Sequence, residues 1–307
     1  MLSVSEALQT TVQKGCACVA LFLNLCLIYL IINKSPKELG SYKYLMIYIS
    51  FLEIVYSVVD VLVLPIFHHT GYTFLIITRL ESSFFNRPIQ SILSGVYCGL
   101  YGACMALFGI HFFYRYLVIK GSKILSTFRS WKIIFWFAIP LIYGSIWGFI
   151  AVVFCGHRDI VNQFVELDVL ENLDLKMADI VYIAPYLFDD NGGIYWPTVL
   201  GLLVDCMIIG SSMFAVVYFG VLLFNELQKY TENNQNLSQK NKSLQTQLYY
   251  SLVTQTLIPV ILLQVPVSIL FTTVFFSFNF GKLTRKCHDM SDSEFLHFLG
   301  LSSTLVD

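Results

Sequence analysis

Long uninterrupted apolar runs are the feature that most limits how this chain can fold. A bilayer core about 30 Å thick is crossed by roughly 20 helical residues at 1.5 Å each. Six runs of about that length or longer lie between charged or turn-forming segments, and they cover Gly15–Asn33, Tyr44–Phe67, Pro88–Ile119, Ile133–Cys155, Pro197–Phe224 and Leu248–Phe280. We therefore predict an all-α fold, a polytopic membrane helical bundle with six full spans in residues 15–280.

Composition and charge exclude several function classes. The 307 residues are 56% hydrophobic and 13% charged, against about 25% charged for a soluble domain. A net charge of −1 provides no basic field, so no nucleic-acid partner is expected, and membrane lipid is the predicted surrounding. The sequence contains no His-Glu-x-x-His, no cysteine pair at zinc spacing and no glycine-rich phosphate loop. We therefore expect no enzyme activity, no metal site and no cofactor.

Lysine and arginine in the loops predict the orientation of the bundle. The loops after the first, third and fifth runs carry ten basic residues, and the opposite side carries five. Because cytoplasmic loops are enriched in Lys and Arg, the N-terminal residues 1–14 are expected outside. The longest loop, 156–196, is acidic and falls on the same outer side. It is interpreted either as a solvated lid or as a segment that touches a ligand directly.

Four short segments resemble the nematode Str superfamily of seven-transmembrane chemoreceptors, and they are Leu39–Met46, His111–Tyr116, Tyr182–Pro185 and Gln255–Pro259. The resemblance extends in order over about residues 14–283. It implies an olfactory G-protein-coupled receptor with an odorant ligand and a heterotrimeric G protein as partners. It also implies an integral protein of the plasma membrane, in the sensory cilium, with its N-terminus outside.

The C-terminal segment 281–307 departs from the family pattern, because it stands where members carry a seventh span. A truncated gene model, a splice form or a pseudogene product would each produce this. Two alternatives to a signalling receptor therefore stay open. One is a truncated, non-signalling form, and the other is an ion-coupled transporter or channel that uses Glu53, Asp60 and Asp205 as ion sites.

The outer halves of three predicted spans carry polar residues at matching depths. These candidate ligand-binding residues are Asp60, Tyr97, Tyr101 and Asp205. Asp205 shares its helical face with Thr198 and Ser212, at steps of seven residues. Together they predict either one polar pocket with an aromatic wall or a set of interhelical hydrogen bonds without a ligand.

The inner halves carry candidate coupling residues. Glu53 and His111 lie at similar depth, so the two side chains can form a pair. The alternative is that His111 is a packed polar residue that bonds to a backbone carbonyl. Arg115 is about 6 Å from the inner end of its span, so its side chain can reach the interface. Its setting resembles the acidic-Arg-Tyr signature of rhodopsin-like receptors, with Tyr114 in place of the acid. Glu53 is then the nearest carboxylate that could hold Arg115 in an inactive state.

Two prolines, Pro259 and Pro266, interrupt the sixth span. Proline frees backbone carbonyls and bends a helix. The bend is either a static kink or, by the receptor resemblance, part of a moving switch element.

Overall fold

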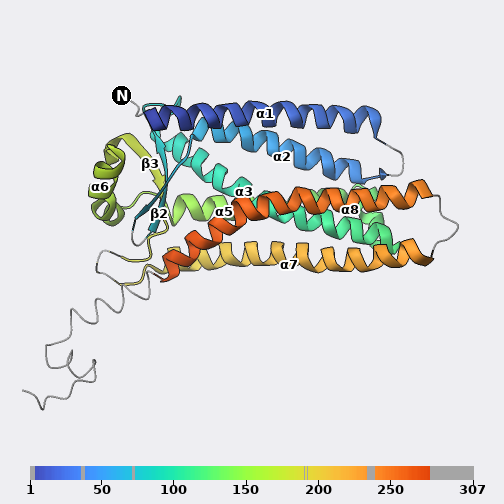
Figure 1. Ribbon diagram of the computed structural model, residues 1–307. Helices are drawn as coiled ribbons and strands as arrows, with labels where there is room; N and C mark the ends of the chain where they lie inside the picture. Colours follow the sequence, from blue (N-terminus) through green and yellow to red (C-terminus); the bar gives the residue numbers. More distant parts are fainter. Residues whose placement is uncertain are drawn as a thin grey trace, which may run out of the picture.

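The computed structural model describes residues 4–35, 39–70, 73–189, 191, 193–233 and 239–276, and shows a bundle of long helices with a small sheet at one end (Figure 1). In this part of the chain six helices are long and apolar enough to cross a membrane: α1 (Val4–Lys34), α2 (Tyr42–Val63), α3 (Arg87–Lys120), α5 (Ile133–Val153), α7 (Trp196–Asn233) and α8 (Gln239–Pro259) with its continuation to Phe276. Helices satisfy their own backbone hydrogen bonds, as a lipid surrounding demands. The predicted helical membrane bundle is confirmed.

A small sheet, which the sequence analysis did not anticipate, closes one end of the bundle. Its antiparallel strands pair in the order β1 (Ile66–Thr70), β2 (Thr73–Arg79) and β3 (Ile180–Ile183). Helix α6 (Asp159–Leu173) covers the sheet with Val161, Val165 and Val169, which pack against Leu75 and Ile77 of β2. We call the sheet and α6 the cap, the end of the bundle beside it the cap end, and the opposite end the Arg115 end.

Three short elements complete the connections between the long helices and the strands. They are η2 (Lys123–Leu125), α4 (Ser126–Arg129) and η3 (Met177–Asp179). The first two lie between α3 and α5 at the Arg115 end, and η3 leads from α6 into β3.

Helix α2 ends earlier than predicted, at Val63 instead of Phe67. Leu64 adopts a left-handed conformation with φ of 47°. Pro65 follows, and a proline disfavours the α conformation in the residue before it. The apolar residues that remain of the predicted span begin β1, so hydrophobicity alone overestimated this helix.

Other helices are longer than the apolar runs that predicted them. Helix α1 begins at Val4 instead of Gly15, and α7 runs on to Asn233, past the predicted end at Phe224. An apolar run marks only the part of a helix that suits hydrocarbon, while polar turns can extend it beyond. The predicted end of the sixth span at Phe280 and the tail 281–307 lie outside the described residues.

Helix α3 is the centre of the bundle. In its most apolar stretch 72% of the residues are buried, compared with 17–22% in the other five membrane-length helices. One core cluster at the cap end surrounds Tyr101 and Trp147, and a second at the Arg115 end surrounds Leu107 and Tyr114. Residues on α3 therefore reach both ends of the molecule.

Glycines bring α3 and α5 into backbone contact. A Cβ atom added at Gly99 would overlap the carbonyl oxygen of Gly144, and one added at Gly144 would lie 2.7 Å from the carbonyl oxygen of Gly99. One turn away, a Cβ at Gly148 would lie 2.8 Å from the carbonyl oxygen of Gly95. Small residues in such register permit close packing of membrane helices.

We predict that Gly99→Ala pushes α3 away from α5 and lowers the thermal stability of the purified protein. Overpacking of this kind costs about 1–3 kcal/mol. The matched control is Gly210→Ala on α7, where an added Cβ meets nothing within 4 Å. That variant should melt at or above the wild-type temperature, because alanine favours a helix over glycine. Equal melting temperatures for the two variants would contradict the contact.

Candidate functional site

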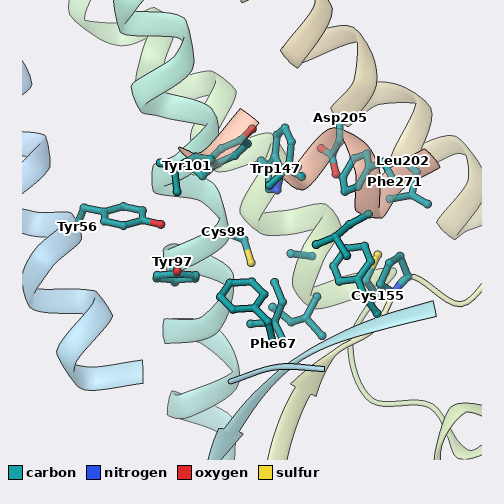
Figure 2. A pocket seen from close by; sticks show the side chains of 18 residues that line it. Tyr56, Phe67, Tyr97, Cys98, Tyr101, Trp147, Cys155, Leu202, Asp205 and Phe271 are labelled. Atoms are coloured by element: carbon teal, nitrogen blue, oxygen red, sulfur yellow. The ribbon is translucent and has the colours of Figure 1, made fainter. Parts of the chain in front are cut away.

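A cavity of about 110 Å³ lies beneath the cap, bounded by α2, α3, α5, α7, the last part of α8 and the sheet (Figure 2). Its walls are apolar, and their aromatic members are Tyr56, Phe67, Phe74, Tyr97, Tyr101, Trp147 and Phe271. A dry cavity of about 150 Å³ holds benzene. This one therefore suits a molecule of similar size or slightly smaller.

Aromatic contacts tie the walls of the cavity together. Trp147 on α5 receives the edge of Tyr101 at a centroid distance of 5.2 Å and stacks with Phe271 at 6.0 Å. Phe271 in turn stacks with Phe74 of the cap at 6.1 Å. The contacting rings thus come from α3, α5, the last part of α8 and the sheet, so a molecule bound among the rings contacts all four elements.

Asp205 is the acidic residue in the wall. It projects from α7 toward Trp147 and Phe271 (Figure 2) and is 3% exposed. Its Oδ1 atom has no hydrogen-bond partner in the described part of the chain. Of its predicted face-mates, Thr198 donates to the carbonyl oxygen of Phe154 at 2.7 Å, and Ser212 lies outside the cavity wall.

Three of the four residues predicted for one pocket, Tyr97, Tyr101 and Asp205, line the cavity. The fourth, Asp60, does not, and this corrects the expectation. It accepts a hydrogen bond from Nε2 of Gln13 at 3.1 Å in a separate hollow beside α1. Helix α2 turns this face toward α1 because the two helices pack together.

The acidic loop supplies part of the roof. Ile183 and Pro185 face the cavity, while Asp168 on α6 bonds to Nε2 of His68 at 2.6 Å and fastens α6 to β1. Side chains alternate along strand β2. Phe74 and Ile76 face the cavity, whereas Leu75 and Ile77 face α6. The described part of the loop therefore both covers and lines the cavity.

Arg158 and Tyr182 hold the cap in shape. The guanidinium of Arg158 donates to the carbonyl oxygens of Tyr186 and Phe188 at 3.2 and 2.8 Å. The hydroxyl of Tyr182 donates to Oδ1 of Asn162 at 2.7 Å. Burial raises the pKa of Tyr182, so this hydroxyl keeps its proton for the bond.

Helix α8 contains a π-helical turn, η4 (Val260–Gln264), between Pro259 and Pro266. The helix changes direction over this region (Figure 1). The hydroxyl of Tyr101 points away from the cavity centre and donates to Oε1 of Gln264 at 2.5 Å. The π turn therefore places a buried amide against α3, at the site where the sequence predicted an interruption.

Arg115 is buried at the other end of the bundle, at 2% exposure. Its guanidinium donates to Oε1 of Gln245 on α8 at 2.5 Å and lies 5.2 Å from the ring centre of Tyr42. Tyr114 also stacks on Tyr42, at a centroid distance of 5.4 Å. The side chain does not extend to the interface as expected, because these aromatic residues and Gln245 enclose it.

The predicted pairs with Glu53 do not form. Nδ1 of His111 lies 3.3 Å from the hydroxyl of Tyr42, and Glu53 lies beside Asn24 of α1. Arg115 is held by an amide instead of this carboxylate. As with Asp60, α2 turns its acidic face toward α1.

The sequence analysis missed the two amides on α8. Gln264 lies inside an apolar run, and a polar residue in such a run needs a hydrogen-bond partner. Its position was therefore a usable signal, but only ionisable groups were considered as candidates. Gln245 gave no such signal, because it lies in the polar first turns of α8. Phe74 and Ile76 were also missed, although Thr73–Arg79 is rich in strand-forming residues.

Six membrane-length helices in the described residues, with a cavity under a cap at one end, define a helical membrane bundle with a candidate ligand site. Residues 9–288 match the model of the family described as serpentine type 7TM GPCR chemoreceptor Str, and the chain belongs to this family. The resemblance seen in the sequence is thereby confirmed.

Two relatives are receptors of the genus Caenorhabditis. The chain is 31% identical to "G-protein coupled receptor str-217" of Caenorhabditis elegans over 86% of this chain and 77% of the relative. It is 29% identical to "Serpentine receptor class r-10" of Caenorhabditis briggsae over 84% of this chain and 75% of the relative. No solved structure matches the chain.

Proposed function

We propose that this protein is a chemosensory receptor that binds a small odorant-type molecule in the cavity beneath the cap and activates a heterotrimeric G protein at the Arg115 end. The observation that carries the proposal is the pair of hydrogen bonds between α3 and α8. Tyr101–Gln264 lies at the cavity and Arg115–Gln245 at the far end, with the π turn next to the first. One helix thereby connects the two sites.

The cavity provides a way to shift α8. Leu263, Val267, Leu270 and Phe271 of its outer part line the cavity, so an occupant presses on this segment. A ligand shifts a two-state equilibrium only when it binds the two states differently. A molecule that favours a displaced Phe271 meets that condition, and the π turn supplies a place for the helix to bend.

The Arg115 end provides the response. In the described state Arg115 is covered by Tyr42 and held by Gln245. Movement of α8 away from α3 breaks the bond to Gln245 and exposes the guanidinium. A hydrogen bond to a charged group is worth about 1.5–3 kcal/mol, a suitable size for a lock that ligand binding can release.

The distribution of basic residues supports an orientation with the Arg115 end in the cytoplasm. Basic residues of the loops and helix ends gather there, among them Lys34, Lys43, Lys120, Lys123, Arg129 and Lys132. The cap and the N-terminus then lie outside the cell, in the plasma membrane of a sensory cilium as the family implies. An odorant reaches the cavity from that side.

A transporter or channel function has less support. The three carboxylates that would serve as ion sites have separate surroundings, with Glu53 beside Asn24, Asp60 bonded to Gln13, and Asp205 in the cavity. Within the described residues no cluster of His, Cys, Asp and Glu could hold a metal ion.

We predict that Ala151→Phe abolishes the response to small odorants while the surface level stays near wild type. Ala151 lines the cavity, and a phenyl ring would fill most of its volume. The control is Val153→Phe, two residues along α5 and 52% exposed. Responses would be measured as odorant-stimulated GTPγS binding in membranes. An Ala151→Phe receptor with a wild-type odorant profile would remove the cavity from the mechanism.

Tyr101→Phe should raise basal G-protein activation about fivefold. It keeps the ring in the aromatic wall and removes the bond to Gln264, worth about 1 kcal/mol. The control is Tyr143→Phe, which removes a hydroxyl 3.3 Å from Ser211, between α5 and α7. Basal GTPγS binding at matched surface level is the measurement, and equal basal rates for both variants would argue against the α3–α8 lock.

Arg115→Ala should eliminate ligand-stimulated activation although the receptor still reaches the surface. The control is Arg129→Ala, which removes an exposed positive charge from the same end. The ratio of GTPγS binding to surface level in each variant is the readout. Normal activation by the Arg115 variant would exclude the residue from coupling.

A further inference from the structure

The chemical class of the ligand follows from Asp205, if the cavity is the ligand site as proposed above. We infer that the cavity binds a small primary amine whose ammonium group pairs with the carboxylate of Asp205. The ligand provides the positive charge that the described surroundings of this carboxylate lack.

The first argument is the missing partner. Asp205 is 3% exposed and its Oδ1 atom accepts no hydrogen bond within the described residues. None of the described residues that line the cavity is Lys, Arg or His. Arg158 lies in the cap above, but its guanidinium already binds the carbonyl oxygens of Tyr186 and Phe188 and covers the ring of Tyr195. A buried carboxylate is costly unless it is paired, and an ammonium group that enters the cavity supplies that pair.

The second argument is the aromatic wall beside the carboxylate. Asp205 points toward the rings of Trp147 and Phe271, which stack at a centroid distance of 6.0 Å (Figure 2). Aromatic faces attract ammonium groups, with tryptophan the strongest, and the attraction grows when water is excluded. The site therefore offers one ionic contact and two ring contacts to the same cation.

The third argument is size. A cavity of about 150 Å³ holds benzene. The cavity beneath the cap has a volume of about 110 Å³, so it accommodates a compact molecule of similar size or slightly smaller. With one polar atom at Asp205, the rest of the occupant must be hydrocarbon, because the other walls offer mainly apolar atoms. Small alkylamines and cycloalkylamines of about six non-hydrogen atoms meet both conditions.

A matched pair of probes tests the inference on the unaltered protein. Cyclopentylamine and cyclopentanol have nearly the same shape, but only the amine is a cation near neutral pH. Binding to the purified full-length chain in nanodiscs would be measured by saturation-transfer NMR titration. We expect the amine to bind at least about tenfold more tightly, since a charge-assisted bond replaces a neutral one. Equal affinities, or no binding of the amine, would overturn the inference.

Variants assign the difference to one residue. Asp205→Asn keeps the shape of the side chain and should weaken amine binding at least about tenfold while changing alcohol binding less than about threefold. The control is Glu226→Gln, the same loss of charge about 30 Å further along α7, where the carboxylate pairs with Lys229 at 3.3 Å. Unchanged amine affinity in a folded Asp205→Asn protein would also overturn the inference.

The outcomes separate this inference from the proposed function. If the alcohol binds as well as the amine and Ala151→Phe abolishes both, the cavity is a ligand site but the amine class is wrong. If the amine binds through Asp205 yet never stimulates GTPγS binding, the amine class is right and the receptor mechanism is wrong.

Discussion

The backbone contact between α3 and α5 at Gly99 and Gly144 sets the arrangement of the remaining helices. Apolar side chains in a bilayer gain little by leaving lipid for each other, so close van der Waals packing decides which helices pair. Where two glycines face each other, the helix axes approach until backbone atoms touch. This contact fixes α3 beside α5, and α2, α7 and α8 then pack on the remaining faces of α3. A helix surrounded in this way can hold a cavity at one end and a buried arginine at the other.

Much of the fold could be predicted from the sequence because the bilayer imposes a single simple requirement, about 20 apolar residues for each crossing. The same simplicity explains the errors. A count of apolar residues contains no information on the helix stop at Leu64 and Pro65, so the predicted second span included the start of β1. The cap follows different rules, those of strand pairing and side-chain alternation, and its sheet joins segments about 100 residues apart.

The candidate site was predictable in depth but not in direction. Counting residues from a helix end places Asp60 and Asp205 in the same half of the bundle, but the face each presents depends on which neighbour its helix packs against. Helix α2 packs on α1 and takes Asp60 and Glu53 with it, whereas α7 leaves Asp205 facing the cavity. The partners of Tyr101 and Arg115 are neutral amides, which an analysis of charges passes over. Tertiary packing therefore decided which of the polar residues meet.

The π turn in α8 has a consequence for how receptors of this kind diverge. A π turn holds one residue more than an α turn, and the wide turn itself absorbs the extra residue. Loss of a single codon between Val260 and Gln264 would therefore restore a regular helix without changing the faces that Gln245 and Phe271 present on either side of the turn. The part that would change is the turn that carries Gln264, the partner of Tyr101. Insertion and deletion at this position thus alter the contact between α8 and α3 in a single evolutionary step, and they leave the cavity wall and the opposite end of the molecule in place.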